Sequence, residues 1–231
     1  MAHVFRPHAY RALVIGASGG IGSAVADELH SDPYCLELVR LSRRIDGFDV
    51  TNEESVAEAA ERTSGELHLI FCATGGLTID GVGPEKSLKQ ITPDAMMQQF
   101  ALNALGTALV LKHFSAKLCR QEPAVMAFLS ARLGSIGDNR LGGWISYRAS
   151  KAALNQIVRT ASVEIGRTHP KAAVVTLHPG TVATQLTDGY AAGRNRMAPD
   201  ESARAMLGLL GQLQPNDTGH FFAYDGSSIE W

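Results

Sequence analysis

Short apolar runs alternate with longer helical patterns along this chain. The runs at 12–15, 67–71 and 125–129 are almost continuously apolar, which is typical of strands buried on both faces. A chain that alternates strands with helices forms a mostly parallel sheet, because each parallel connection has to cross over the sheet. We therefore expect a single α/β domain over residues 1–231, with a doubly wound sheet of about seven strands and helices on both faces.

The apolar spacing also places the individual elements. The predicted strands are 10–15, 36–41, 67–72, 125–129, 173–177 and 220–224, with a further short one at 48–50. The predicted helices are 21–30, 53–63, 146–166, 199–213 and, as one helix or two, 92–118. Thr51 or Asn52 is expected to cap the second helix, and Thr92 with Pro93 to begin the long one.

Composition excludes several classes of protein. A net charge of -2 leaves no basic field to attract nucleic acid or an anionic membrane surface. The most apolar window, around 101–111, is too short to cross a bilayer, and the first eight residues lack the apolar stretch of a signal peptide. The 3 cysteines are scattered and the 8 histidines show no metal-ligand spacing, which indicates reduced thiols and no metal site. We expect a cytoplasmic protein with no nucleic-acid or membrane partner.

The first predicted strand runs directly into a glycine-rich turn and then into a helix. Glycine permits the tight turn and lets the backbone approach a pyrophosphate, while the helix N-terminus supplies free N–H groups. A Rossmann dinucleotide site requires this context, although the spacing here is GxxxGxG and a merely tight connection is the alternative interpretation. The predicted contacts are Gly16, Ser18, Gly19, Gly20, Ile21 and Gly22.

The end of the second predicted strand favours NADP(H) over NAD(H). An acidic residue there would bind the ribose 2′-OH of NAD, whereas basic residues suit the 2′-phosphate of NADP. Here Ser42, Arg43 and Arg44 come before the first acid, Asp46. Two guanidinium groups and a hydroxyl match a phosphate, and a solvated basic loop is the alternative.

Tyr147 and Lys151 stand one helical turn apart, so both side chains project from the same helix face. A cation about 5 Å from a phenol, at an effective dielectric of about 20, favours the phenolate by roughly 3 kcal/mol. We therefore expect Lys151 to lower the pKa of Tyr147 toward the range in which proton transfer is efficient. The alternative is a half-buried tyrosine beside a solvated lysine, and the neighbouring cofactor site argues against it.

Together these residues resemble the short-chain dehydrogenase/reductase family, from about residue 10 to the C-terminus. The glycine turn matches the glycine motif of the family, Tyr147 and Lys151 match YxxxK, and 179–184 matches PGxVxT. Asn103 matches the helix asparagine that helps to hold a proton-relay water. Segments within 134–151 and 222–231 are similar to the C-factor-like and sniffer-type carbonyl reductases.

The resemblance implies further cofactor contacts. Asp49 and Val50 look like the acid–aliphatic pair beside the adenine ring. The NNAG stretch of the family appears here as Cys72-Ala73-Thr74-Gly75, which lacks both asparagines. The contacts implied by these two stretches and by PGxVxT are Asp49, Val50, Ala73, Gly75, Pro179, Gly180, Val182 and Thr184.

The catalytic serine is the position at which this chain departs from the family. The family places that serine at the end of the fifth strand, about a dozen residues before the tyrosine. Here Ser130 ends the predicted strand, and Ala131 is a candidate for the usual position of the serine. Ser135 stands twelve residues before Tyr147, in a predicted loop. We favour Ser130, with Ser135 as its rival and a reaction that needs neither hydroxyl as the third alternative.

The activity implied by the resemblance is hydride transfer between NADP(H) and a small carbonyl or alcohol substrate. Tyr147 would act as the general acid/base, with Asn103, Ser130 and Lys151 completing the catalytic set. Segment 185–198 is predicted to be a mobile lid, in which Arg194 and Arg196 either recognise an anion or are simply solvated. A homodimer or homotetramer is expected by analogy. The alternative function is a C-factor-like signalling or regulatory protein that binds the nucleotide with little turnover.

Overall fold

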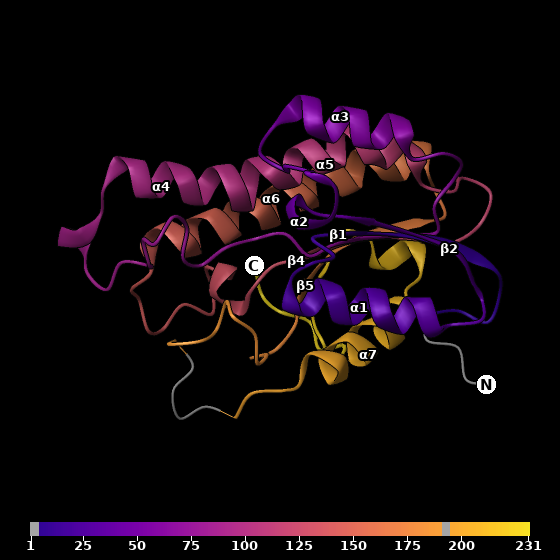
Figure 1. The fold of residues 1–231 in the computed structure, drawn as a ribbon. Coiled ribbons are helices and arrows are strands. Elements are labelled where there is room, and N and C mark those ends of the chain that lie inside the picture. Colours follow the sequence, from indigo (N-terminus) through magenta and orange to yellow (C-terminus); the bar gives the residue numbers. More distant parts are fainter. Residues whose placement is uncertain (1–4, 191–194) are drawn as a thin grey trace.

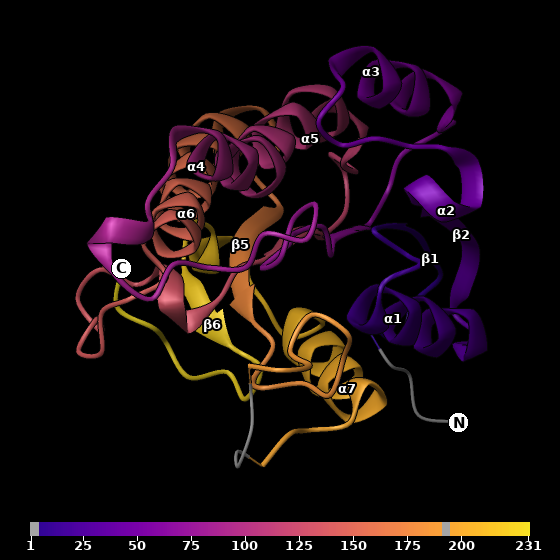
Figure 2. The ribbon, with the colours of Figure 1, turned by 60° about the vertical axis from the view of Figure 1, so that its left-hand side comes forward.

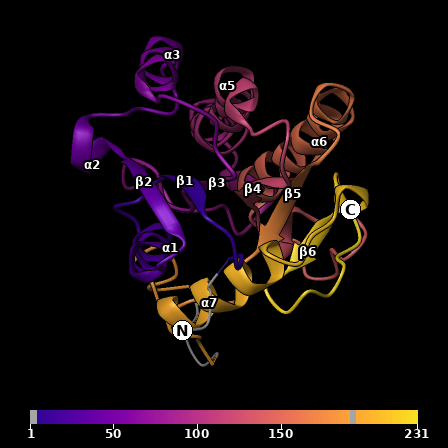
Figure 3. The same ribbon diagram turned by 90° about the vertical axis from the view of Figure 1, so that its right-hand side faces the viewer.

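The computed structural model describes residues 5–190 and 195–231. Within them, six parallel strands form one sheet in the order β2-β1-β3-β4-β5-β6. The strands are β1 (Tyr10–Ile15), β2 (Cys35–Leu41), β3 (Leu69–Cys72), β4 (Ala124–Leu129), β5 (Ala172–His178) and β6 (Phe221–Ala223). The chain moves outward from β1 to β2 and then returns to the other side of β1 (Figure 3). The strand order therefore reverses beside β1, and ligands of open α/β sheets bind at such a switch point.

Helices cover both faces of the sheet, as the alternating pattern predicted. One face carries α1 (Gly20–Ser31) and α7 (Pro199–Leu210), and the other carries α3 (Glu53–Arg62), α4 (Pro93–Phe100), α5 (Gly106–Phe114) and α6 (Ile145–Thr168) (Figures 1 and 2). The short α2 (Arg43–Asp46) follows β2 directly. Among the described residues, no helix has the length and apolar content needed to cross a membrane.

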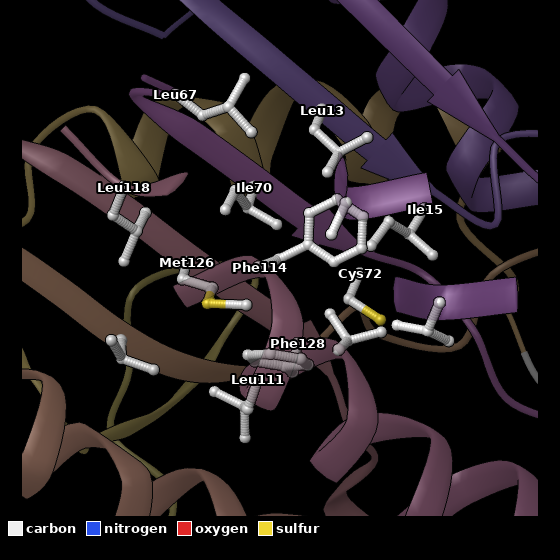
Figure 4. Packing of buried hydrophobic residues seen from close by; sticks show 14 of the residues in the cluster. Leu13, Ile15, Leu67, Ile70, Cys72, Leu111, Phe114, Leu118, Met126 and Phe128 are labelled. Carbon is white, nitrogen blue, oxygen red and sulfur yellow. The ribbon is translucent and has the colours of Figure 1, made fainter. Parts of the chain in front are cut away.

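Two apolar clusters fill the spaces between the sheet and its helices. Leu13 and Ile15 of β1 point into the cluster under α5 and α6, which also contains Phe114 and Phe128 (Figure 4). The alternate residues of β1, such as Val14, point into the cluster under α1 and α7. Successive side chains of a strand face opposite sides of the sheet. A strand covered on both sides must therefore be apolar throughout, which explains the continuous runs.

The predicted seventh strand at 48–50 is wrong. These residues form an irregular segment and a turn, in which the Asp49 carboxylate accepts hydrogen bonds of 2.9 and 2.8 Å from the backbone N–H and the hydroxyl of Thr51. Local side-chain bonds of this kind compete with the ladder bonds of a strand. Phe48 and Val50 are nevertheless buried in the core, which accounts for the apolar pattern that suggested a strand.

The long helical segment predicted at 92–118 is broken into parts. It begins at Thr92, whose Oγ1 accepts a hydrogen bond from the N–H of Ala95, and runs through α4 into a π-helical turn, Ala101–Leu105, before α5. Of the two candidate caps for α3, Asn52 is the one whose side chain accepts from the first turn. A π-helical turn inside an α-helix is rare and frequently marks a functional site.

Candidate active site

A cleft of about 1580 Å³ opens at the carboxyl edge of the sheet. Its walls come from the glycine turn after β1, the ends of β3 and β4, the start of α6 and the segment after β5. Fifteen of the predicted site residues line it: Ser18, Gly19, Gly20, Ile21, Gly22, Arg44, Ala73, Gly75, Ser130, Tyr147, Lys151, Pro179, Gly180, Val182 and Thr184. The chain thus brings together, at one edge, residues that are separated by up to 166 positions in the sequence.

Gly20 and Gly22 in the glycine turn have no room for a side chain. A Cβ on Gly20 would lie 2.6 Å from the Thr184 Cγ2, and one on Gly22 would overlap the carbonyl oxygen of Gly16. Gly16 itself has a φ of +84°, which side chains disfavour. No side chain caps the start of α1, and the first N–H groups of a helix have no acceptor within the helix. A bare backbone with free donors at a helix start fits the diphosphate of a dinucleotide.

The basic residues after β2 lie beside this turn in different ways. Arg44 lines the cleft, whereas Arg43 does not. The Ser42 hydroxyl is buried and accepts a hydrogen bond of 3.2 Å from the N–H of Ile45, which caps α2. Both arginines are exposed, so a guanidinium group is available at the edge where the dinucleotide ribose is expected.

Asp49 and Val50 lie outside the cleft lining. Partial burial raises the pKa of Asp49, but the hydrogen bonds from Thr51 and the positive charge of Arg43 outweigh it and bring that pKa below its usual value. Val50 packs against α5, where a Cβ on Gly106 would lie 3.0 Å from both of its methyl groups. Contact of this pair with the adenine ring stays a prediction.

Tyr147 and Lys151 are both buried, and both line the cleft from the first two turns of α6. The Lys151 Nζ lies 6.0 Å from the centre of the Tyr147 ring and donates a hydrogen bond of 3.0 Å to the carbonyl oxygen of Leu129. A Cβ on Gly75 would lie 2.9 Å from this Nζ and 3.0 Å from the Asn103 Oδ1. The ammonium, the amide and the Gly75 backbone therefore converge behind the tyrosine.

Asn103 lies in the π-helical turn and forms hydrogen bonds to the segments around it. It lies behind the cleft lining, and its Nδ2 donates to the Gly76 carbonyl (3.1 Å), to Gln99 (2.7 Å) and to Ser150 (3.2 Å). Its Oδ1 accepts a hydrogen bond of 3.0 Å from the N–H of Gly76. Asn103 thus ties the loop after β3 to α4 and α6, while the relay water remains a prediction.

The predicted lowering of the Tyr147 pKa is wrong for this structure. Burial raises the pKa of the Tyr147 phenol above its ordinary value, because a phenolate loses more hydration than a phenol does. Burial likewise lowers the pKa of Lys151 from 10.5 to about 8. The ammonium points at the Leu129 carbonyl rather than at the phenol oxygen, so desolvation outweighs the attraction that the sequence argument relied on.

The two candidate serines occupy different environments. Ser130 lines the cleft, and its hydroxyl donates a hydrogen bond of 2.6 Å to the Asn155 Oδ1 in the interior. Ser135 is buried outside the cleft lining, and its hydroxyl accepts from the N–H of Asp138 at 3.0 Å. Ala131 lines the cleft next to Ser130. The geometry favours Ser130 over Ser135 as a substrate contact.

The segment after β5 contributes residues 179–187 and Tyr190 to the lining of the cleft. The predicted lid, 185–198, includes residues 191–194 and thus Arg194, which lie outside the described residues. Arg196 forms an ion pair of 2.7 Å with Asp188, so a carboxylate of the same segment neutralises its charge. The Tyr190 hydroxyl lies 2.7 Å from the Thr78 Oγ1 across the cleft.

An aromatic wall that the sequence argument missed stands beside Tyr147. The Trp144 ring meets the Tyr147 ring edge to face at 6.5 Å and the Tyr190 ring at 5.4 Å. His178 also lines the cleft, and its Nδ1 is buried without a partner among the described residues. The tight Gly142-Gly143-Trp144 sequence just before the catalytic helix was the available signal for the wall.

Known proteins resemble this chain over most of its length. A family model described as enoyl-(acyl carrier protein) reductase matches residues 16–228. The 1-hydroxy-2-glutathionyl-2-methyl-3-butene dehydrogenase of Rhodococcus sp. (strain AD45) is 30% identical over 232 residues, which cover 95% of this chain and 98% of that protein. The C-signal protein of Myxococcus xanthus is 37% identical over 137 residues, 59% of this chain and 78% of that one.

Solved structures agree with the sequence comparison. An NADPH-bound carbonyl reductase from chicken fatty liver matches with a TM-score of 0.85 at 26% identity, covering 99% of this chain and 97% of that one. The carbonyl reductase Sniffer of D. melanogaster, at 20% identity, has the same fold with a TM-score of 0.83 over 97% of this chain and all of that one. The resemblance inferred from the motifs is confirmed, and the chain belongs to the short-chain dehydrogenase/reductase family.

Proposed function

We propose that this protein is an NADP(H)-dependent oxidoreductase that interconverts a small carbonyl compound and the corresponding alcohol, with Tyr147 as the acid/base. The observation that carries this proposal is that Tyr147 and Lys151 line the same cleft as the glycine turn. A protein that only bound a nucleotide would have no use for a phenol beside a buried ammonium. The Rhodococcus relative is named as a dehydrogenase, and the chicken structure is that of an NADPH-bound carbonyl reductase.

In the reduction of the carbonyl substrate, each residue of the site has a separate role. Bound NADPH supplies the hydride. Burial keeps the Tyr147 phenol protonated at neutral pH, so it is ready to donate its proton to the substrate oxygen as negative charge develops there. Lys151, whose pKa burial brings to about 8, would return the proton to Tyr147 through an intervening water, because its ammonium faces the Leu129 carbonyl and not the phenol oxygen. Ser130 donates a hydrogen bond to the same substrate oxygen, and Asn103 anchors the water that leads to solvent.

Separate parts of the site would bind the diphosphate, the 2′-phosphate and the nicotinamide of the nucleotide. The first turn of α1 holds the diphosphate, and Arg44 with Arg43 holds the 2′-phosphate that distinguishes NADP from NAD. Pro179, Gly180, Val182 and Thr184 seat the nicotinamide carboxamide. These assignments explain why Gly20 and Gly22 have no room for a side chain and why Arg43 and Arg44 follow β2.

The test is NADPH oxidation against a panel of aldehydes, ketones and quinones, with Tyr147→Phe as the matched variant. This variant keeps the ring and its contact with Trp144 and removes only the hydroxyl. We expect kcat to fall by about 10²–10⁴-fold, the usual contribution of a general acid, with NADPH affinity unchanged. Turnover that survives in Tyr147→Phe would refute the assignment.

A regulatory, C-factor-like role remains the second candidate because of the match to the C-signal protein. NADPH binding without any Tyr147-dependent turnover, against the whole panel, would favour it.

We further propose that the protein acts in the cytoplasm as a homodimer or homotetramer that pairs through α5 and α6. Exposed apolar residues on this part of the surface, Leu105 and Val163, support such pairing, and light scattering of the purified protein tests it.

A further inference from the structure

The start of the catalytic helix α6 adopts a strained conformation. Gly142, Gly143 and Trp144 have φ angles of +64°, +68° and +54°, three left-handed residues in succession. Glycine adopts this region readily, but a large aromatic residue does not, and such residues persist only where the surroundings hold them. Trp144 is also the N-cap residue of α6, and its side chain makes no capping hydrogen bond. Something else must hold this end of the helix.

Glu85 supplies that hold from the loop between β3 and α4. Its backbone carbonyl accepts a hydrogen bond of 2.6 Å from the N–H of Trp144. Its carboxylate accepts from the N–H of Ser146 at 3.2 Å and from the Ser146 hydroxyl. Glu85 is buried, lies 61 residues from Ser146 in the sequence and is absent from the lining of the cleft. It therefore acts as a cap for α6 that comes from another part of the chain.

Arg148 closes the same loop from the opposite side. Its Nε donates to the Gly143 carbonyl at 2.9 Å, and its Nη2 donates to the Gly142 carbonyl at 3.2 Å. The Arg148 guanidinium group thus holds Gly142 and Gly143, and the backbone carbonyl of Glu85 holds Trp144. The Glu85 carboxylate holds the first turn of α6, at Ser146. Trp144, at the end of this segment, is the residue whose ring packs edge to face against Tyr147.

We propose that Glu85 is a positioning residue for Tyr147, because the Glu85 carboxylate holds Ser146 in the first turn of α6 and thereby keeps the Trp144 ring in place against Tyr147. The proposal rests on the acid/base role proposed for Tyr147. Glu85 would touch neither substrate nor cofactor. Its effect reaches the reaction because proton donation requires the phenol oxygen to meet the substrate oxygen at hydrogen-bond distance.

The first experiment compares Glu85→Ala with Glu85→Gln. We expect Glu85→Ala to lower kcat by about tenfold or more while the Kd for NADPH stays within about twofold, since small misplacement of a reacting group is costly to the rate. Glu85→Gln keeps an oxygen that accepts from the N–H of Ser146, so we expect it to retain at least about a third of wild-type kcat. Glu54→Ala, which removes an exposed carboxylate from the first turn of α3, is the control and should match wild type.

A second experiment tests whether the effect passes through Trp144. If it does, Glu85→Ala combined with Trp144→Ala should lose no more kcat than Trp144→Ala alone. Additive losses, an unchanged kcat in Glu85→Ala, or a parallel loss of NADPH affinity would each overturn the proposal.

A third readout does not depend on turnover. The chain has 2 tryptophans, so Trp231→Phe leaves Trp144 as the only one. In this background we expect Glu85→Ala to shift the emission of Trp144 to the red and to increase its quenching by acrylamide. Unchanged emission would overturn the proposal even if no substrate were turned over. Failure of the proposed function would appear differently, as activity that survives in Tyr147→Phe.

Discussion

Lys151 gives the sharpest test of the electrostatics of the site. Replacing it with Met keeps a long, flexible side chain and removes the buried charge. Burial lowers the pKa of Lys151 from 10.5, its ordinary value, to about 8. Below pH 8 the lysine is charged in both the folded and the unfolded chain, so the folded state carries the full cost of burying the ammonium.

The sign of the pH dependence follows from proton linkage. As pH rises from about 8 to 10.5, the folded chain releases this proton before the unfolded chain does, so folding stability increases with pH. Each pKa unit corresponds to about 1.4 kcal/mol, so the whole change is about 3 kcal/mol, most of it reached by pH 10. Relative to Lys151→Met, wild type should therefore gain about 2–3 kcal/mol between pH 7 and pH 10.

The assay is urea unfolding of both proteins at pH 7, 8, 9 and 10, followed by circular dichroism. Other groups titrate in this range, but they are common to both proteins and cancel in the difference. Cys72 is the exception, because burial raises the pKa of its thiol and the charge of Lys151 acts against that. Both proteins are therefore compared in a Cys72→Ala background. A difference that stays constant from pH 7 to pH 10 would refute a desolvated Lys151.

Three further predictions concern the two candidate serines, a pair of glycines and Arg44. Ser130→Ala should lower kcat about tenfold, less than loss of a free oxyanion donor, because its hydroxyl must leave the buried Asn155 oxygen to reach the substrate. Ser135→Ala should leave kcat unchanged. A larger loss of kcat in Ser135→Ala than in Ser130→Ala would make Ser135 the candidate. Gly22→Ala should abolish NADPH binding in a calorimetric titration, whereas Gly166→Ala, which has open space in α6, should stabilise the fold by about 0.5–1 kcal/mol in urea. Arg44→Ala should weaken NADPH binding by about tenfold and leave NADH binding unchanged, and equal losses for both nucleotides would contradict its phosphate role.

Some site features were accessible to sequence reasoning because they depend on neighbours in the chain. Tyr147 and Lys151 share a helix face as a consequence of a four-residue spacing in any helix. The glycine turn is recognisable because its strand, turn and helix are consecutive. Its exclusion of side chains at Gly20 and Gly22 agrees with the conformational role that the pattern indicated.

Other predictions failed or stayed open because they depended on burial. The segment 48–50 has the composition of a strand. Its conformation is decided instead by the hydrogen bonds that the Asp49 carboxylate accepts from Thr51 and by packing of Val50 against α5. The pKa of Tyr147 was predicted to fall because of the neighbouring Lys151, but burial of the ring beside Trp144 raises it instead.

By itself, the order of residues determined the alternating architecture, the dinucleotide turn and the tyrosine–lysine pair, since each arises from contacts within a few residues or from the period of one element. Only the tertiary structure decided which serine reaches the cleft, what surrounds Asn103, and that Glu85 caps a helix 61 residues away. Those outcomes depend on which distant segments share a buried space, and a hydrogen bond across the fold leaves no periodic signal in the sequence.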